Sequence, residues 1–129
     1  KNFEKMKKSR YDLVEFYNKI FDKFENVINL NNSKNILYNY YTIQLPPSKR
    51  DKIQDELMKL NISTSIYYSK PVHMQKALRN INYLSDDLKN TNLLSKTVLS
   101  LPLFPFMKRN EKQYLKNSIS KVLYKHGIK

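Results

Sequence analysis

The sequence contains no cysteine, a single glycine and two histidines. Without cysteine the chain has no disulfide, no thiolate nucleophile and no thiolate ligand for zinc. The one glycine, Gly127, excludes a GxGxxG or Walker loop, because both loops need several glycines to approach a phosphate closely. With only His73 and His126 as imidazoles, we expect no metal site.

Long apolar runs are also missing. No stretch approaches the roughly 18 consecutive apolar residues of a membrane span, and the lysine-rich start lacks the apolar core of a signal peptide. We therefore expect a soluble, cytoplasmic protein with no membrane partner. At 129 residues, without a repeat or a linker, the whole chain (residues 1–129) is expected to form a single domain with its own hydrophobic core.

Acidic residues are scarce, since 11 Asp and Glu stand against 24 Lys and Arg, which gives a net charge of +13. Such an excess attracts polyanions, so one candidate function is a non-catalytic basic module that binds nucleic acid or another polyanion. The basic residues are spread along the whole chain, however, whereas a nucleic-acid footprint should cluster. Nucleic acid is therefore the less favoured partner, and this alternative requires a contiguous basic stripe with exposed aromatic side chains.

Apolar spacing and turn residues predict an alternation of helices and short strands. The expected elements are helices at residues 8–25, 49–60, 86–97 and 111–124, a short helical piece at 74–79, and strands at 36–45 and 62–67. On the first strand, alternation places Leu37, Tyr41, Ile43 and Leu45 on the core side. This order predicts an α/β (α+β) fold in which a small sheet is covered by helices.

The helix expected at residues 49–60 carries three local predictions. Ser48 and Asp51 are expected to form a variant of the capping box at its start. Arg50 is a cation in the first turn, where the helix dipole disfavours it, so we expect a structural ion pair there. Asn61 suits the left-handed conformation that follows a helix end.

Prolines dominate the segment LSLPLFPF, residues 99–106. Pro102 and Pro105 exclude a helix and disfavour a central strand, because proline cannot donate a backbone hydrogen bond. This segment is therefore expected to be extended and largely buried.

The stretch TSIYYSKPVHMQK, residues 64–76, combines phenols, an imidazole and an amide where a strand gives way to a proline turn. Tyr67 and Tyr68 each offer a flat face for a sugar or a base and a hydroxyl for hydrogen bonds. Taken alone, the pair is better explained as ordinary strand tyrosines, since strands are enriched in tyrosine. His73 has no acid or nucleophile beside it, which favours a structural hydrogen bond over catalysis.

Short motifs follow one another along the chain. They are Arg10 and Tyr17 in SRYDLVEFYNKIF, Tyr41-Thr42-Ile43, Arg50-Asp51, Asn61-Ile62-Ser63-Thr64, residues 67–75 (YYSKPVHMQ, with Pro71), and VLSLPLFPFM with Pro102. No single motif is specific, but their order and spacing resemble the C-terminal part of sugar-nucleotide aminotransferases of the DegT/DnrJ/StrS family. The resemblance extends over nearly all of the chain.

The resemblance implies the aspartate aminotransferase fold (fold type I), of which this chain would be the small C-terminal domain, with a short, mainly antiparallel sheet covered by helices. It implies a homodimeric enzyme dependent on pyridoxal phosphate (PLP) that transfers an amino group, from glutamate, to a nucleotide-linked keto-sugar in polysaccharide or cell-surface sugar biosynthesis. In this chain the substrate-binding residues would be Tyr67, Tyr68 and His73, with Gln75 behind them.

The family's large domain has no counterpart in this sequence. In the family, that domain carries the lysine that holds the cofactor as an imine, the acidic partner of the pyridine nitrogen and the phosphate-binding groups. We therefore expect no catalytic residue and no bound cofactor in this chain alone, and a partner that is the missing large domain or a separate chain carrying it. Such a partner requires an exposed apolar surface on the first helix or on residues 99–106.

Three departures from the family pattern bear on binding. Asn61 replaces the usual glycine, and Ser69 replaces the usual first proline, which loosens the turn after the tyrosines. Tyr67 stands where some relatives carry histidine, and a tyrosine is neutral at pH 7. A neutral hexose is therefore expected as the sugar, rather than a uronic sugar whose carboxylate would pair with a protonated imidazole.

Overall fold

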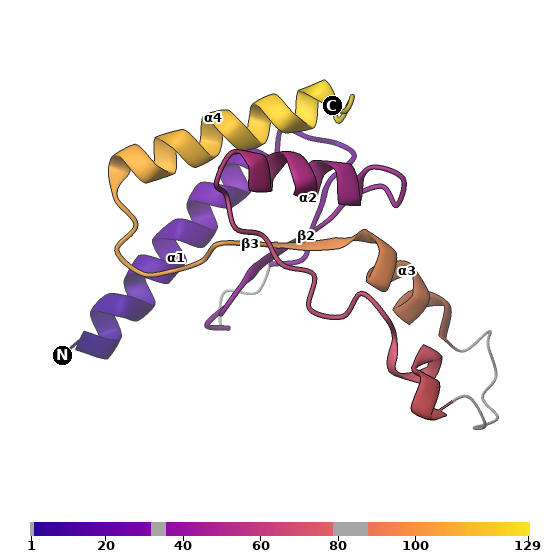
Figure 1. The fold of residues 1–129 in the computed structure, drawn as a ribbon. Coiled ribbons are helices and arrows are strands. Elements are labelled where there is room, and N and C mark those ends of the chain that lie inside the picture. Colours follow the sequence, from indigo (N-terminus) through magenta and orange to yellow (C-terminus); the bar gives the residue numbers. More distant parts are fainter. Residues whose placement is uncertain (1, 32–35, 79–87) are drawn as a thin grey trace.

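The computed structural model describes residues 2–31, 36–78 and 88–129. In chain order these residues form α1 (Asn2–Phe21), β1 (Ile28–Asn29), β2 (Tyr41–Gln44), α2 (Arg50–Lys59), the short 3-10 helices η1 (Val72–Met74) and η2 (Lys76–Leu78), α3 (Lys89–Thr97), β3 (Val98–Leu101) and α4 (Arg109–Lys125). The predicted helical residues 79, 86 and 87 lie outside the described ranges. Helices α2 and α4 lie side by side, while α3 extends away from them (Figure 1).

The sheet has three antiparallel strands in the order β1-β2-β3. In its register Tyr41 lies opposite Leu101, and Gln44 lies opposite Val98. The predicted fold class, a short antiparallel sheet covered by helices, is confirmed. Residues 99–101 of the proline-containing segment belong to β3, which lies at one end of this strand order and ends directly before Pro102. The segment is extended there and buried as far as Leu103, as predicted, whereas Phe104 and Phe106 are exposed.

Both predicted strands are shorter than expected. The first begins only at Tyr41 rather than at residue 36, and the second is reduced to an isolated bridge between Ser65 and Ser100 of β3. Periodicity alone overestimates the length of such strands, because a residue belongs to a strand only where a partner strand pairs with it, and local sequence does not reveal the partner. The core side of the first strand is predicted correctly from Tyr41 onward, since Tyr41, Ile43 and Leu45 are buried, whereas Leu37 is only partly buried.

Aromatic side chains of α1 and β2 form the centre of the hydrophobic core. The Tyr41 ring lies 4.6 Å from that of Tyr17 and 5.7 Å from that of Phe21, measured between ring centroids. The buried faces of α2 and α4 complete the same core. The helix at the start of the chain runs from Asn2 to Phe21, so it begins and ends earlier than predicted, and Phe24 is buried in the turn that follows it.

The start of α2 differs from its prediction in one respect. The residue that precedes the helix is Lys49, and no side chain caps it, so the predicted capping box of Ser48 and Asp51 is wrong. Asp51 instead lies 2.6 Å from Nε of Arg50, whose buried side chain also donates to the Val98 carbonyl at 3.3 Å. The predicted ion pair of Arg50 is therefore confirmed within α2, and the hydrogen bond from Arg50 to Val98 links α2 to β3.

Asn61 adopts the left-handed conformation that the sequence predicts, with φ of 56°. We expect Asn61→Ala to lower the free energy of unfolding by about 1 kcal/mol, because alanine tolerates positive φ less well than asparagine. Asn61→Gly should equal or exceed the original stability, since glycine carries no Cβ. Urea unfolding of the three proteins measures the order, and an alanine variant as stable as the glycine variant would contradict this account.

The C-terminal end of α4 is held against α2 by Glu56. Its carboxylate accepts from Lys125 Nζ at 2.9 Å and lies 3.1 Å from His126 Nε2, whose side chain is only 15% exposed. The hydrogen bond from Lys125, opposed by partial burial and reinforced by His126, holds the pKa of Glu56 below its usual value of 4.5.

This arrangement predicts a pH dependence of stability. Because the pKa of Glu56 is lower in the folded state than in the unfolded state, its contribution is complete above the unfolded value of 4.5 and is lost as the pH falls through the folded value. We expect Glu56→Gln to lose less stability than the original chain between about pH 6 and about pH 3. Urea midpoints across this range measure it, with Glu15→Gln on the exposed face of α1 as the control. Parallel pH profiles for Glu56→Gln and the original chain would refute the prediction.

Candidate functional site

The candidate binding stretch begins where the chain leaves the sheet. Ser65 exchanges two backbone hydrogen bonds of 2.9 Å with Ser100 of β3, and the chain then turns at Tyr67 and Tyr68. Tyr67 is 50% exposed and Tyr68 is 76% exposed. Neither tyrosine is therefore required by the core, which leaves both available for a ligand.

His73 and Gln75 lie farther along the stretch. His73 lies in η1, and its Nε2 is 3.0 Å from Oδ1 of Asn92 in α3, so the imidazole ties η1 to α3. Pro71 is buried at the start of this turn, whereas Gln75 is exposed. Of the four predicted substrate-binding residues, only Tyr67 lines the main pocket of the described chain.

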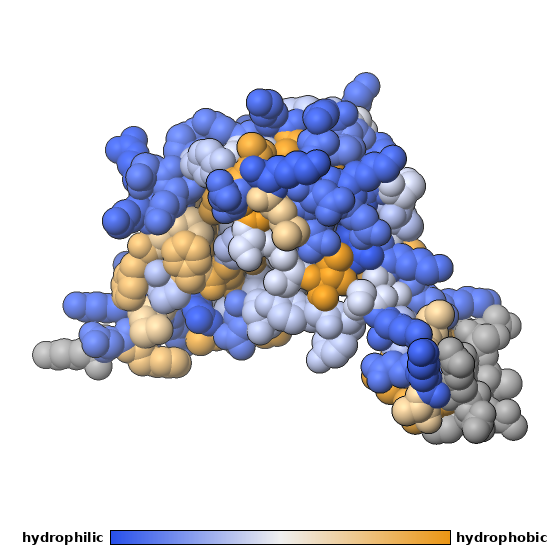
Figure 2. All heavy atoms as spheres, viewed as in Figure 1, coloured by the Kyte–Doolittle hydropathy of each residue, from blue (hydrophilic) through white to orange (hydrophobic). Residues whose placement is uncertain are grey.

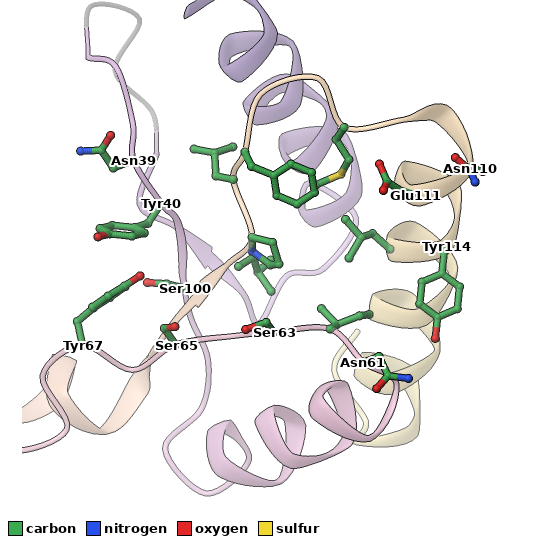
Figure 3. A pocket seen from close by; sticks show the side chains of 17 residues that line it. Asn39, Tyr40, Asn61, Ser63, Ser65, Tyr67, Ser100, Asn110, Glu111 and Tyr114 are labelled. Carbon is green, nitrogen blue, oxygen red and sulfur yellow. The ribbon is translucent and has the colours of Figure 1, made fainter. Parts of the chain in front are cut away.

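That pocket has a volume of about 800 Å³. It lies between residues 61–65, the end of β3 with the connection that follows, and the first half of α4 (Figure 3). Its polar lining consists of Asn39, Tyr40, Asn61, Ser63, Ser65, Tyr67, Ser100, Asn110, Glu111 and Tyr114. Its apolar lining consists of Ile62, Leu101, Pro102, Leu103, Phe104, Met107 and Leu115. A volume of this size lies within the range of about 300–1,000 Å³ that is usual for small-molecule sites.

Tyr40 lies in this pocket beside Tyr67, and the sequence prediction of the site missed it. The two ring centroids are 4.3 Å apart, with an angle of 42° between the ring planes. A hydrogen bond with Tyr67 raises the pKa of Tyr40, so its phenol remains neutral at ordinary pH. The signal in the sequence was the aromatic stretch YNYY, in which strand alternation already placed Tyr40 opposite the core side.

Two of the motif residues on α1 support the walls of the pocket. Arg10 donates to Oδ1 of Asn39 at 2.8 Å and to the Tyr38 carbonyl at 3.3 Å. The buried hydroxyl of Tyr17 donates to the Pro102 carbonyl at 2.8 Å. Since Asn39 and Pro102 both line the pocket, α1 holds two of its walls in place.

The electrostatic character of the pocket contrasts with that of the chain. Its lining includes one ionisable carboxylate, Glu111, which accepts from the Lys108 backbone N–H at 2.6 Å, and no lysine, arginine or histidine. PLP requires a lysine to hold it as an imine, so the lining of this pocket does not fit that cofactor. Among residues 2–31, 36–78 and 88–129, no group of three His, Asp or Glu side chains is placed to hold a metal ion.

An exposed apolar surface lies where the β3–α4 connection passes the first half of α1. Phe104 and Phe106 of the connection are 46% and 62% exposed. The Phe106 backbone N–H donates to Oγ of Ser9 at 2.7 Å, which joins the two segments. Figure 2 shows apolar side chains gathered at this place, at the left of the view, and we call it the phenylalanine patch.

The phenylalanine patch bears on the two functions that the sequence left open. The aminotransferase interpretation requires an exposed apolar surface on α1 or on residues 99–106, and the patch combines both segments. The basic-module interpretation requires a basic stripe with exposed aromatic rings. Phe104 and Phe106 are exposed on an apolar surface rather than along a basic stripe, which favours the first interpretation. Within the described residues, no helix has the length and apolarity that crossing a membrane demands.

Comparison with known proteins shows where this fold and these motifs recur. The "Pleiotropic regulatory protein" of Geobacillus stearothermophilus is 34% identical over 90 residues, which are 70% of this chain and 23% of that protein. NtdA of Bacillus subtilis, solved with the cofactor PMP bound, superposes with a TM-score of 0.80 at 20% identity, over 92% of this chain and 28% of that one. An aminotransferase of Helicobacter pylori involved in the biosynthesis of pseudoaminic acid superposes with a TM-score of 0.78 at 18% identity, over 93% and 33%.

These matches establish the family and the extent of the chain within it. The chain spans a third or less of the length of the relatives named above. The profile of the DegT/DnrJ/EryC1/StrS aminotransferase family matches residues 1–120, nearly the whole sequence. The chain therefore belongs to the DegT/DnrJ/EryC1/StrS aminotransferase family, as its motifs predicted.

Proposed function

We propose that this chain is the C-terminal, substrate-binding part of a PLP-dependent aminotransferase that transfers an amino group from glutamate to a nucleotide-linked keto-sugar. The family match over residues 1–120 carries the proposal. The Helicobacter pylori aminotransferase, which is involved in the biosynthesis of pseudoaminic acid, supports a sugar as the substrate. A role in polysaccharide or cell-surface sugar biosynthesis is part of the same proposal.

The residues of the candidate site are suited to binding a substrate rather than to catalysis. Tyr67 and Tyr68 present half-exposed and exposed rings, which can pack against the sugar nucleotide. His73 is held by Asn92 and therefore positions the loop that carries the tyrosines, while the exposed Gln75 offers an amide next to it. In this proposal the lysine that would hold PLP belongs to the remainder of the enzyme, and a pocket lining without lysine is consistent with it.

The phenylalanine patch is evidence for a partner that covers it in the complete enzyme. Large apolar side chains that remain exposed in one chain are typical of surfaces covered by a partner. In this proposal the partner is the PLP-binding large domain, supplied by the same polypeptide or by a separate chain, and the assembled enzyme is a homodimer. The length of the relatives, about three times that of this chain, is consistent with such a component.

The test is to translate the DNA immediately upstream and to produce that product together with this chain. We expect a lysine-bearing domain of the family, in the same or a separate reading frame. The assembled protein should bind PLP, and glutamate should abolish the imine absorbance, whereas this chain alone should show neither effect. An unrelated upstream product, or an assembled protein that binds PLP but does not respond to glutamate, would contradict the proposal.

The sugar preference is a separate prediction. We expect the assembled enzyme to bind a nucleotide-linked neutral hexose at least as tightly as the corresponding uronate. The physical reason is that Tyr67 is uncharged and that the pocket lining contains Glu111 but no basic side chain to pair with a carboxylate. Competition binding with the two nucleotide sugars measures it. A uronate that binds more than about tenfold tighter, a difference of about 1.4 kcal/mol, would rule out the neutral-hexose prediction.

A further inference from the structure

We propose that Tyr40 and Tyr67 together form the wall of a binding site for an uncharged hexose ring in the pocket described above, so that Tyr40 is a substrate-binding residue in its own right. The inference rests on the proposed function for its ligand, a nucleotide-linked sugar. It goes beyond that function by naming the place of the sugar ring and a residue outside the family-like stretch at residues 67–75.

The geometry of the aromatic pair is the first support. Tyr40 and Tyr67 lie next to each other at one end of the pocket (Figure 3), and about half of each side chain is exposed, 48% and 50%. A tilted pair of this kind offers a larger apolar face than either ring alone. The C–H face of a sugar ring packs against such a face, because aromatic rings gain their contact energy from flat apolar surfaces.

The backbone explains why Tyr40 is available for a ligand. Tyr41, the next residue, is fully buried and packs against Tyr17, so alternation directs Tyr40 to the opposite side of the strand. Arg10 holds the preceding residues through its hydrogen bonds to Tyr38 and Asn39. These bonds hold the chain next to Tyr40, whose ring is not buried by the core and contacts Tyr67 instead.

The polar groups of the pocket favour a sugar over a charged ligand. Ser63 and Ser65 bring hydroxyl groups to the pocket, and Ser65 lies at the end that Tyr40 and Tyr67 occupy (Figure 3), whereas the hydroxyl of the buried Ser100 is already paired with Thr42 Oγ1 at 2.9 Å. Hydroxyls both donate and accept hydrogen bonds, which matches the hydroxyls of a hexose. The diphosphate of a nucleotide sugar is doubly anionic and would find no basic side chain in this lining, so it should remain outside the pocket.

The experiment uses the chain itself, labelled with ¹⁵N, and three probes: UDP-glucose, UDP and methyl glucoside. We expect UDP-glucose and methyl glucoside to shift the backbone amide signals of Ser63, Ser65 and Ser100, and UDP to leave these signals unchanged. Tyr40→Ala should weaken the binding of UDP-glucose by about fivefold, the loss expected for one aromatic contact. If the alanine variant is unstable, Tyr40→Leu replaces it in the test. Leucine keeps an apolar side chain without a flat ring, so the same weakening is expected.

The matched control is Tyr124→Ala. Tyr124 is also exposed, at 59%, and its ring contacts that of Phe24 at 5.1 Å, but it does not line the pocket. Its replacement should leave the affinity for UDP-glucose unchanged. If UDP shifts the amide signals of the pocket serines as much as UDP-glucose does, the pocket binds the nucleotide rather than the hexose, and the inference is overturned. No shift at the serines, or equal affinities of the Tyr40 and Tyr124 variants, would overturn it as well.

The outcome separates this inference from the proposed function. If the assembled enzyme transfers amino groups while the serines of the pocket do not respond to the hexose, the inference alone fails. If the hexose binds beside Tyr40 while the assembled protein never responds to glutamate, the proposed function alone fails.

Discussion

Replacing Tyr17 by alanine is expected to lower the free energy of unfolding by about 4 kcal/mol, a large part of the stability of a domain of this size. The Tyr17 side chain is fully buried, and its ring contacts those of Tyr41 and Phe21. Its removal leaves a cavity at the centre of the core and takes away the hydroxyl that donates to Pro102. Urea unfolding followed by circular dichroism measures the change.

Two phenylalanine variants separate the ring of Tyr17 from its hydroxyl. Tyr17→Phe should lose about 1–2 kcal/mol, because the Pro102 carbonyl loses its donor while the packing of the ring remains. Tyr41→Phe is the matched control, since Tyr41 is equally buried but donates to Oδ1 of Asn18, away from the pocket. Tyr17→Phe should also change the position of Pro102 in the pocket wall, whereas Tyr41→Phe should leave the pocket wall unchanged. Unchanged stability of Tyr17→Phe would show that the hydrogen bond to Pro102 does not stabilise the fold.

Replacing Phe106 by glycine is expected to act in opposite directions on folding and on assembly. Phe106 has φ of 65°, a conformation that costs a bulky residue about 1–2 kcal/mol, and at 62% exposure its ring gains little burial in return. We therefore expect Phe106→Gly to stabilise the chain by about 1 kcal/mol. Since the ring belongs to the phenylalanine patch, the same change should weaken association with the large domain by about 30-fold.

Phe106→Ala distinguishes the backbone from the ring. Alanine removes the ring but keeps the Cβ that the left-handed conformation disfavours, so it should weaken assembly as glycine does without stabilising the chain. Phe104→Ala, at an exposed residue of the same patch, should also weaken assembly. Chemical unfolding of the chain alone and titration of the two components measure the two effects. If Phe106→Gly associates with the large domain as tightly as the original chain does, the phenylalanine patch is not the docking surface.

The sequence was sufficient to predict the helices, because the apolar spacing and the end-of-helix residues that mark a helix are local features of the chain. Apolar spacing located α2 and α4 to within two residues but placed the start of α1 six residues too late, and Asn61 marked the end of α2 by its tolerance of positive φ. The motifs were sufficient for the family, since they depend only on residue order and spacing. The strands were predicted less well, because a strand exists only where a partner pairs with it, as Ser65 does for one bridge alone.

What the sequence by itself determined is therefore the family, the helical faces and the character of the stretch at residues 67–75. The tertiary structure alone decided which of those residues share a pocket. It placed Tyr67 beside Tyr40 and His73 beside Asn92, and so separated two side chains that the motif joins. The physical reason is that the bridge between Ser65 and Ser100 carries the Tyr67 turn to the end of the sheet where Tyr40 lies. No local spacing contains that long-range contact.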